Sequence, residues 1–377
     1  MTRPRSHVLS LAAAALLTLT SCSSDGGIAI DNSAAASTTT AVEVPATSTT
    51  AAPTPSAAPG AADVGDPLTP GAGNGGYDVD HYDLDIDLAI DRSTISDATT
   101  TITAVATTSL STFNLDLAGL DVIGVAVDGA TATSTRVGDE LVVTPAEPVA
   151  EGATFEAVVR YSGTPRPIDD PSAPGDIGWF VEPTGTFVAS EPTGAKGFFP
   201  CNDHPSDKAT YTFTISASSA DTAVANGVLV SKVPDPADAG RTVWTFDQDD
   251  PMATYLVQMA VGDYDLIEST GPNGLPLRHV VVRRLSPDDR ARLDETGAQI
   301  EYFETMFGPY PFDTYGLLVA DASPDWALET QTLTLLPAGW IELDSPEGTS
   351  SVMAHELAHQ WFGNAVSPAR WNDIWLN

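Results

Sequence analysis

The sequence predicts a mainly β protein that continues into an α/β region, and three observations support this fold class. Its 377 residues are enough for about two domains. From Tyr77 onward, short segments rich in Thr and Val alternate polar and apolar residues, which is typical of half-buried strands. After Ser269 the pattern changes to strands that alternate with helical spacing. We therefore expect an N-terminal antiparallel β domain over residues 77–266 and an α/β domain over residues 267–377.

Each expected element follows from its local pattern. The expected strands of the β domain are short segments bounded by turn residues, at residues 82–90, 99–110, 112–120, 141–146, 155–163, 209–218, 242–248 and 254–268. In the second domain, two further strands are expected at residues 275–284 and 315–321. A helix is expected over 286–308, because Ser-Pro-Asp-Asp is a favourable start and Gly308 a favourable end. Another helix is expected over 350–364, where Gly363 and Asn364 indicate the end.

The N-terminus has the layout of a bacterial secretory signal. Arg3 and Arg5 precede an apolar run that is too short to span a bilayer. The run ends in Leu-Thr-Ser-Cys, which resembles a lipoprotein box and predicts a lipid on Cys22; an ordinary signal peptide is the alternative. We expect residues 1–22 to be this signal and 23–76, rich in Ser, Thr, Ala and Pro, to be a disordered linker. The protein would then be lipid-anchored on the extracytoplasmic side of the cell membrane.

Composition excludes one class of partner. The formal net charge is −35, and nucleic-acid binding needs a basic surface. We therefore expect no nucleic-acid partner, and we expect the membrane to be contacted through the N-terminal lipid anchor.

The sequence His-Glu-x-x-His near the C-terminus carries the chemistry. Residues four apart lie on one face of a helix, so His355 and His359 can hold one zinc ion. Glu356 lies beside them, where a general base for a zinc-activated water belongs. The alternative is that the helix histidines are satisfied by solvent or by core partners.

Several ordered motifs, over about residues 77–377, resemble the M1 family of zinc aminopeptidases. HELAHQWFGN followed by W-x-D-x-W-L-N matches the zinc helix of that family. Residues 77–88, 189–213 and 307–321 resemble further family segments, and residues 326–333 stand where the family has Gly-x-Met-Glu-Asn. The resemblance implies that 267–377 is the start of a thermolysin-like catalytic domain.

The resemblance also implies roles for individual residues. His355 and His359 would be ligands of Zn2+, one ion per chain in the complete protein, and Glu356 would be the general base. Glu191 and Glu329 would bind the free α-amino group of a peptide substrate, which makes the enzyme an exopeptidase.

The sequence departs from the family pattern in two places. The Gly, Met and Asn of the family motif are Trp326, Leu328 and Thr330 here, which puts the shape of the pocket for the first substrate side chain in doubt. In the family, eighteen residues separate the third zinc ligand, a glutamate, from the second histidine, and residues 360–377 are those eighteen. We therefore expect a C-terminally truncated sequence without this ligand and without the catalytic tyrosine, and an inactive fragment.

The predicted function is a zinc-dependent aminopeptidase that releases N-terminal residues from peptides with a free N-terminus. Two alternatives remain. One is another hydrolase of the same zinc-site class, such as an endopeptidase or an epoxide hydrolase. The other is a non-catalytic surface binding protein whose β domain is the working part.

Overall fold

The computed structural model describes residues 56–173, 175–322, 326–343 and 345–377. The predicted signal, Cys22 and most of the predicted linker lie outside these residues. Within them, no helix has the length and apolar character needed to cross a membrane.

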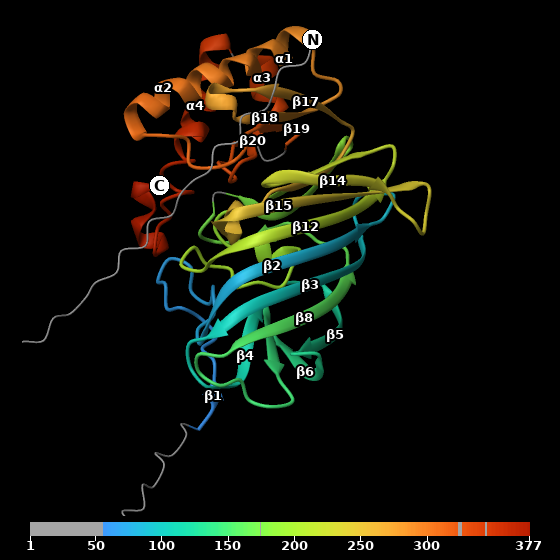
Figure 1. Ribbon diagram of the computed structural model, residues 1–377, viewed down its shortest axis with the longest axis vertical. Coiled ribbons are helices and arrows are strands. Elements are labelled where there is room, and N and C mark those ends of the chain that lie inside the picture. Colours follow the sequence, from blue (N-terminus) through green and yellow to red (C-terminus); the bar gives the residue numbers. More distant parts are fainter. Residues whose placement is uncertain (1–55, 174, 323–325, 344) are drawn as a thin grey trace, which may run out of the picture. The chain divides into compact units, whose positions relative to one another are not determined.

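The largest sheet in the described part of the chain has eleven strands, in the order β1-β4-β7-β6-β5-β8-β3-β2-β12-β15-β14. Figure 1 shows β2, β3, β8, β12 and β15 running side by side in it. Its strands are β1 Ala58–Pro59, β2 Tyr77–Leu88, β3 Ile95–Ala106, β4 Leu110–Asp116, β5 Asp121–Val127, β6 Ala130–Val137, β7 Glu140–Thr144, β8 Thr154–Gly163, β12 Lys208–Ser218, β14 Val228–Pro234 and β15 Arg241–Ala253.

Two smaller sheets complete the β structure of the described residues. A five-stranded sheet has the order β13-β16-β11-β10-β9, and a four-stranded sheet the order β17-β18-β19-β20. Their strands are β9 Ile168–Asp169, β10 Asp176–Glu182, β11 Gly185–Ala189, β13 Thr222–Ala225, β16 Met259–Gly262, β17 Tyr264–Thr270, β18 Pro276–Val282, β19 Leu317–Ala320 and β20 Thr334–Pro337. β18, β19 and β20 are parallel, so the mainly antiparallel β structure continues into an α/β region as predicted.

The alternating pattern of β2 explains its place in the large sheet. Every second residue from Tyr82 to Leu88 is buried, and the aspartates between them lie on the other face. β2 pairs antiparallel with β3 and parallel with β12. The buried Tyr82 ring stacks on Tyr211 of β12 at 5.1 Å and meets Phe199 edge-on at 5.6 Å between ring centroids. This part of the core therefore lies between the large sheet and the chain segment that leads away from β11, and the same buried cluster continues into the four-stranded sheet and the helix over Pro346–Ala358.

The end of the predicted linker is ordered, in contrast to the expectation for residues 23–76. Residues 56–76 include β1, which pairs with β4. They also bury three polar residues, Asp66, Thr69 and Asn74. Asp66 accepts a hydrogen bond from the Trp371 backbone N–H at 2.7 Å, and the Asn74 amide donates to Asp116 at 2.9 Å. A few polar anchors thus order a segment whose composition is too poor in large apolar residues to indicate folding.

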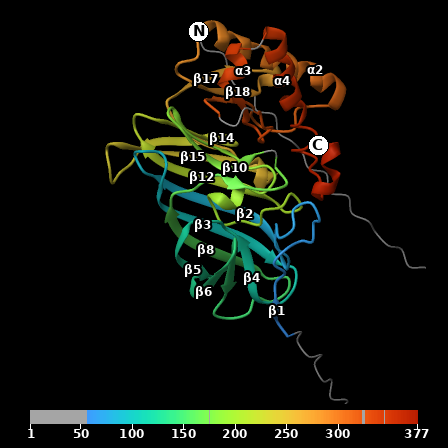
Figure 2. The ribbon, with the colours of Figure 1, turned by 180° about the vertical axis from the view of Figure 1, so that it is seen from behind.

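The helices lie together beside the four-stranded sheet, on the side away from the large sheet, as both views show (Figures 1 and 2). They are α1 Pro287–Arg290, α2 Thr296–Phe307, α3 Ala338–Leu343 and α4 Pro346–Ala358. Short 3-10 helices are η1 Ala195–Gly197, η2 Thr254–Leu256, η3 Pro272–Gly274, η4 Ala291–Glu295 and η5 Trp371–Leu376.

Both expected helices differ from the observed ones in their bounds. The segment 286–308 begins as predicted, since the Ser286 hydroxyl accepts from the Asp289 N–H, but it is divided into α1, η4 and α2. The Thr296 hydroxyl donates to the Leu293 carbonyl at 2.8 Å, which competes with continuous α-helical pairing. The other helix, α4, begins earlier than expected and ends before Gly363.

Candidate metal centre

Helix α4 carries the His-Glu-x-x-His sequence in its last turn. The helix begins at a favourable sequence. The Ser345 hydroxyl caps it by accepting a hydrogen bond from the Gly348 N–H at 3.1 Å, and Pro346 is the first helical residue. α-Helical conformation continues to His359, which is the last half-helical residue with φ −60° and ψ −22°. The two histidines are therefore one turn apart on the same face.

After His359 the backbone changes its hydrogen bonding. The N–H groups of Asn364 and Ala365 donate to the carbonyls of His359 and Gln360, both at 3.1 Å, so each bond spans five residues instead of four. These wider turns end the helix and fold the chain back beside it. This is why α4 ends earlier than the residues Gly363 and Asn364 indicate.

The geometry of the histidine pair fits a zinc ion. The Nε2 atoms of His355 and His359 are 3.3 Å apart. Two nitrogens bound to one tetrahedral zinc at about 2.0–2.1 Å are separated by roughly 3.3–3.4 Å. His355 is exposed and His359 half-buried, so the pair can be reached from solvent.

The tautomer of His359 also fits. Its Nδ1 atom lies 3.2 Å from the Phe362 carbonyl oxygen, which can only accept a hydrogen bond. The proton of a neutral His359 ring is therefore held on Nδ1, and the lone pair of Nε2 is left for a metal. A backbone carbonyl in this position also fixes the orientation of the ring, as is usual for histidine ligands.

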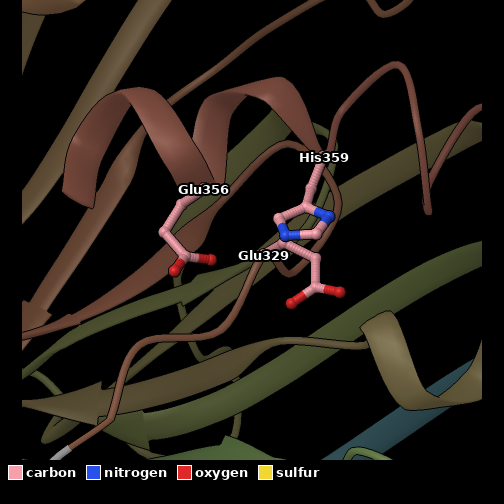
Figure 3. Close-up of side chains that lie close together, drawn as sticks. All are labelled: Glu329, Glu356 and His359. Atoms are coloured by element: carbon pink, nitrogen blue, oxygen red, sulfur yellow. The ribbon is translucent and has the colours of Figure 1, made fainter. Parts of the chain in front are cut away.

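Two carboxylates lie beside the second histidine. Ligand atoms of Glu329, Glu356 and His359 lie within 4.8 Å of one another, and Figure 3 shows the three side chains grouped below the end of the helix. Glu329 follows β19 in the chain and is 5% exposed. Its carboxylate accepts a hydrogen bond from the Asn377 amide at 2.9 Å.

The third predicted carboxylate comes from the large β region, by which we mean residues 58–262 with the eleven-stranded and five-stranded sheets. Glu191 follows β11 and is half-buried. Burial raises the pKa of Glu191, and the negative charges of Glu329 and Glu356 raise it further. The fold therefore brings Glu191 within electrostatic reach of Glu329 and Glu356 from a distant part of the sequence.

The pKa of Glu356 is shifted toward the range that suits proton transfer near neutral pH. Burial raises its pKa to about 8, and the charge of Glu329 adds to this effect. Among the described residues, no lysine or arginine contributes to the pKa shift of either Glu356 or Glu191. The site therefore combines two nitrogen ligands with a group of carboxylates that lack a positive partner within the described chain, and a bound cation would stabilise their ionised forms.

The residues that replace the Gly-x-Met-Glu-Asn pattern have distinct environments. Leu328 is buried and bridges to Leu335 of β20, so it serves the core. Thr330 is fully buried. Trp326 is partly buried against the core, and its indole N–H is enclosed without a hydrogen-bond partner among the described residues.

Sequence reasoning missed the polar residues that support the site. Tyr255, from the large β region, donates to the Gly363 carbonyl at 3.4 Å. Gln360 and Asn364 both donate to the backbone carbonyl of Glu329, at 3.1 and 2.6 Å. Their signal in the sequence was weak: Gln360 is a single polar residue directly after His359, and Asn364 was interpreted only as a helix end.

Comparison with protein families gives two matches in chain order. The family described as Peptidase M1 N-terminal domain matches residues 183–256. The family described as Peptidase family M1 domain matches residues 291–377, which contain both histidines and all of α4.

Among curated proteins, the chain is similar to several aminopeptidases. It is 33% identical over 196 residues to endoplasmic reticulum aminopeptidase 1 of Homo sapiens, and 37% identical over 200 residues to glutamyl aminopeptidase of Bos taurus. It is also 34% identical over 193 residues to aminopeptidase N of Oryctolagus cuniculus. These matches cover 48–50% of this chain but only 20% of each relative, so the chain spans about a fifth of their length.

Solved structures match over a larger share. An M1 zinc metallopeptidase from Deinococcus radiodurans has a TM-score of 0.75 and 32% identity, over 83% of this chain and 71% of that one. A variant of the Deinococcus radiodurans enzyme bound to a Tyr-Ser-Ala substrate has a TM-score of 0.74 and 32% identity with the same coverage. A two-domain M1 zinc metallopeptidase variant bound to L-arginine has a TM-score of 0.75 and 32% identity, also with that coverage.

Proposed function

The chain belongs to peptidase family M1, and from this premise we propose that it acts as a zinc-dependent aminopeptidase that releases the N-terminal residue of peptides. One observation carries the proposal: the histidine pair of α4 lies beside a cluster of carboxylates that has no cationic partner within the described chain. The pair suits a metal ion, and the carboxylates suit a substrate ammonium group. An endopeptidase does not recognise a free N-terminal amine and so has no need of the carboxylate cluster.

His355 and His359 would hold the zinc ion through their Nε2 atoms. When bound there, zinc supplies a Lewis acid that polarises the scissile carbonyl and makes a water molecule more acidic. Catalytic zinc usually has three protein ligands, and the histidine pair supplies two. We therefore expect the pair alone to bind zinc weakly.

Glu356 would act as the general base. Its carboxylate takes the proton of the attacking water and later passes it to the leaving amine, so no net charge remains on the residue after one cycle. Its burial excludes water from one side, and a pKa raised above that of an exposed glutamate makes the carboxylate a stronger base.

Glu191 and Glu329 would bind the α-ammonium group of the substrate. Two carboxylates from different parts of the fold accept charge-assisted hydrogen bonds from one ammonium group, which fixes the N-terminus of the peptide. A fixed N-terminus places the first peptide bond at the reacting position, and acetylation of the amine would remove the charge that is recognised.

We also propose that the protein is lipid-anchored through Cys22 on the extracytoplasmic side of the cell membrane. This rests on the arginine-rich start, the short apolar run and the Leu-Thr-Ser-Cys sequence. Metabolic labelling with a radioactive fatty acid should mark the wild-type protein in a bacterial host but not Cys22→Ser. A labelled Cys22→Ser variant would contradict the anchor.

The test of the catalytic proposal compares binding and hydrolysis with and without a free amine. Isothermal titration with L-arginine and N-acetyl-L-arginine should show tighter binding of the free amine to the zinc-loaded protein, and the difference should shrink in Glu329→Gln and Glu191→Gln. In the full-length protein, hydrolysis of L-arginine p-nitroanilide should stop on chelation and fall by about 10²–10⁴ in Glu356→Gln.

Three outcomes would contradict the proposal in different ways. Equal affinity for both arginine compounds would remove the amine-binding role. Hydrolysis that is unaffected by a chelator would remove zinc. Amine binding by the full-length protein without any hydrolysis would favour a non-catalytic surface binding protein.

A further inference from the structure

The segment that carries Glu329 is buried and is held by side-chain amides. The Gln360 amide nitrogen donates to the Glu329 carbonyl at 3.1 Å, and the Gln360 amide oxygen accepts from the Thr332 N–H at 2.9 Å. One side chain therefore pairs with both ends of residues 329–332, in the way that a neighbouring strand would. The Asn364 amide adds a second donor to the same Glu329 carbonyl, at 2.6 Å.

Gln360 and Asn364 are connected directly to the second histidine. Gln360 follows His359 in the chain, and the Asn364 N–H donates to the His359 carbonyl at 3.1 Å. Both amide side chains are completely buried. The distance between His359 and the backbone of Glu329 is therefore set by two short chains of covalent and hydrogen bonds without solvent between them.

The large β region supports the segment from the other side. The Gly227 N–H donates to the Thr332 hydroxyl at 2.8 Å, and the Asn226 amide donates to the Gln331 carbonyl at 2.5 Å. Thr332 has a φ of 64°, in the left-handed region that a β-branched residue rarely adopts. Such a conformation persists only where the surroundings hold it, and these hydrogen bonds provide that support.

The segment also has to resist repulsion. The Glu329 carboxylate lies close to Glu356 and within electrostatic reach of Glu191, and like charges in a buried site repel. The amide contacts of Gln360 and Asn364 attach the backbone of Glu329 and do not involve its carboxylate, which accepts from the Asn377 amide instead.

We infer that Gln360 and Asn364 are positioning residues, which fix Glu329 relative to His359 and so set the distance between the metal ligands and the amine-binding carboxylate. Neither side chain reaches the reacting atoms; both act through the Glu329 carbonyl. The inference rests on the proposed function in one respect, which is that the Glu329 carboxylate binds the ammonium group of the substrate.

The first test measures the attachment itself and needs neither metal nor substrate. Gln360→Met keeps the length of the side chain and removes both hydrogen bonds. Hydrogen–deuterium exchange followed by mass spectrometry should show at least about tenfold faster exchange of residues 329–332 in Gln360→Met than in the wild type. Unchanged protection of this segment in the folded variant overturns the inference, whatever the protein binds.

Gln299→Met is the matched control. The Gln299 amide also donates to α4, to the Ser350 carbonyl at 2.9 Å, but near the start of the helix and away from Glu329. The Gln299→Met substitution should leave hydrogen exchange of residues 329–332 unchanged. If both Met variants loosen the segment equally, the effect is general destabilisation and the positioning role is overturned.

The second test measures the consequence for amine recognition. In the zinc-loaded protein, Gln360→Met should lower the preference for L-arginine over N-acetyl-L-arginine by about tenfold or more, because a small displacement of a positioned group has a large effect on recognition. Gln299→Met should keep the wild-type preference. A folded Gln360→Met variant with that full preference overturns the positioning role.

Asn364→Leu keeps the inference testable if Gln360→Met does not fold. It removes one donor to the Glu329 carbonyl and should give the same two effects at smaller size, and the absence of both overturns the inference. A wild-type protein that shows no amine preference contradicts the proposed function alone, since hydrogen exchange still decides whether the amides hold Glu329.

Discussion

The Nε2 atoms of His355 and His359 lie 3.3 Å apart across the last turn of α4. At this distance the two rings share at most one hydrogen bond, and the His359 proton is already held on Nδ1 by the Phe362 carbonyl. In a neutral pair, the free lone pair of His359 Nε2 can accept that one hydrogen bond from His355 Nε2, and a metal ion between the two nitrogens would replace it with two bonds. The pair is thus arranged for a cation even in its absence.

Replacement of either histidine should weaken zinc binding. We expect His355→Ala and His359→Ala each to lower the affinity for Zn2+ at least about tenfold, since even the loss of a residue that only supports a ligand costs 10–100-fold. Titration with Zn2+, or with Co2+ followed by absorption, measures this.

His81→Ala is the control for this prediction. His81 lies on β2 of the large sheet, where its Nδ1 atom contacts the Thr210 hydroxyl at 2.7 Å. The His81→Ala substitution should leave the affinity for zinc unchanged. Equal affinities for all three variants would mean that zinc binds elsewhere.

Loss of the helix cap should destabilise α4 without removing any ligand. We expect Ser345→Ala to lower the free energy of unfolding by about 0.5–2 kcal/mol, because the Gly348 N–H loses its acceptor. Urea denaturation measures the change. Ser351→Ala, at an exposed interior position of the same helix, should be neutral or slightly stabilising, since alanine is the better helix former. A cap variant as stable as this control would contradict the prediction.

The sequence was most informative where the chemistry is local. Alternation from Tyr82 to Leu88 predicted β2, and the four-residue spacing of His355 and His359 predicted their shared helix face. Both patterns depend on the geometry of one element. The position of the large β region before the α/β region followed from the change of pattern in the same way.

Contacts between distant segments could not be derived from local patterns. Nothing in the residues around Asp66 indicates that its carboxylate binds the Trp371 N–H, yet such contacts order residues 56–76. The attachment of Glu329 by Gln360 depends on the left-handed Thr332, whose conformation its own residue type disfavours. The resemblance to a family gave the candidate residues of the site, and the structure added those that hold them in place.

The buried carboxyl of Asp207 should make stability decrease with rising pH. Burial raises its pKa to about 7, while the unfolded chain has the ordinary value of 3.8. Between these values the folded state holds a proton that the unfolded state has released. The contribution is therefore fully present below about pH 4 and is lost as the pH rises through 7, with a slope of up to about 1.4 kcal/mol per pH unit.

Asp207→Asn isolates this effect. Urea unfolding at intervals from pH 5 to 8 should show a steeper loss of stability in the wild type than in the variant, which carries no titratable group at that position. The histidines with lowered pKa values, His204 and His279, act in the opposite direction below about pH 6.5, and they do so equally in both proteins. Parallel pH profiles would contradict the raised pKa of Asp207.

The buried guanidinium of Arg278 should be far more important for stability than exposed arginines. Its Nη2 atom donates to the carbonyls of Ala225 and Gly227, at 2.8 and 3.0 Å, and its carbon lies 5.0 Å from the Phe246 ring centroid. Burial lowers its pKa to about 10, so the charge is retained at neutral pH. A lysine ammonium has a different shape and a stronger hydration shell, and we expect Arg278→Lys to lower the free energy of unfolding by about 2–4 kcal/mol.

Arg160→Lys provides the comparison. Arg160 pairs with Asp97 at 2.8 Å on the exposed face of the sheet, where solvent screens the interaction. Urea denaturation of both variants at one pH should show a much larger loss for Arg278→Lys. Because Arg278 holds the turn that also supports Thr332, hydrogen exchange of residues 329–332 should rise in this variant as well. Equal stability of the two lysine variants would show that the Ala225–Gly227 carbonyls gain little from the guanidinium.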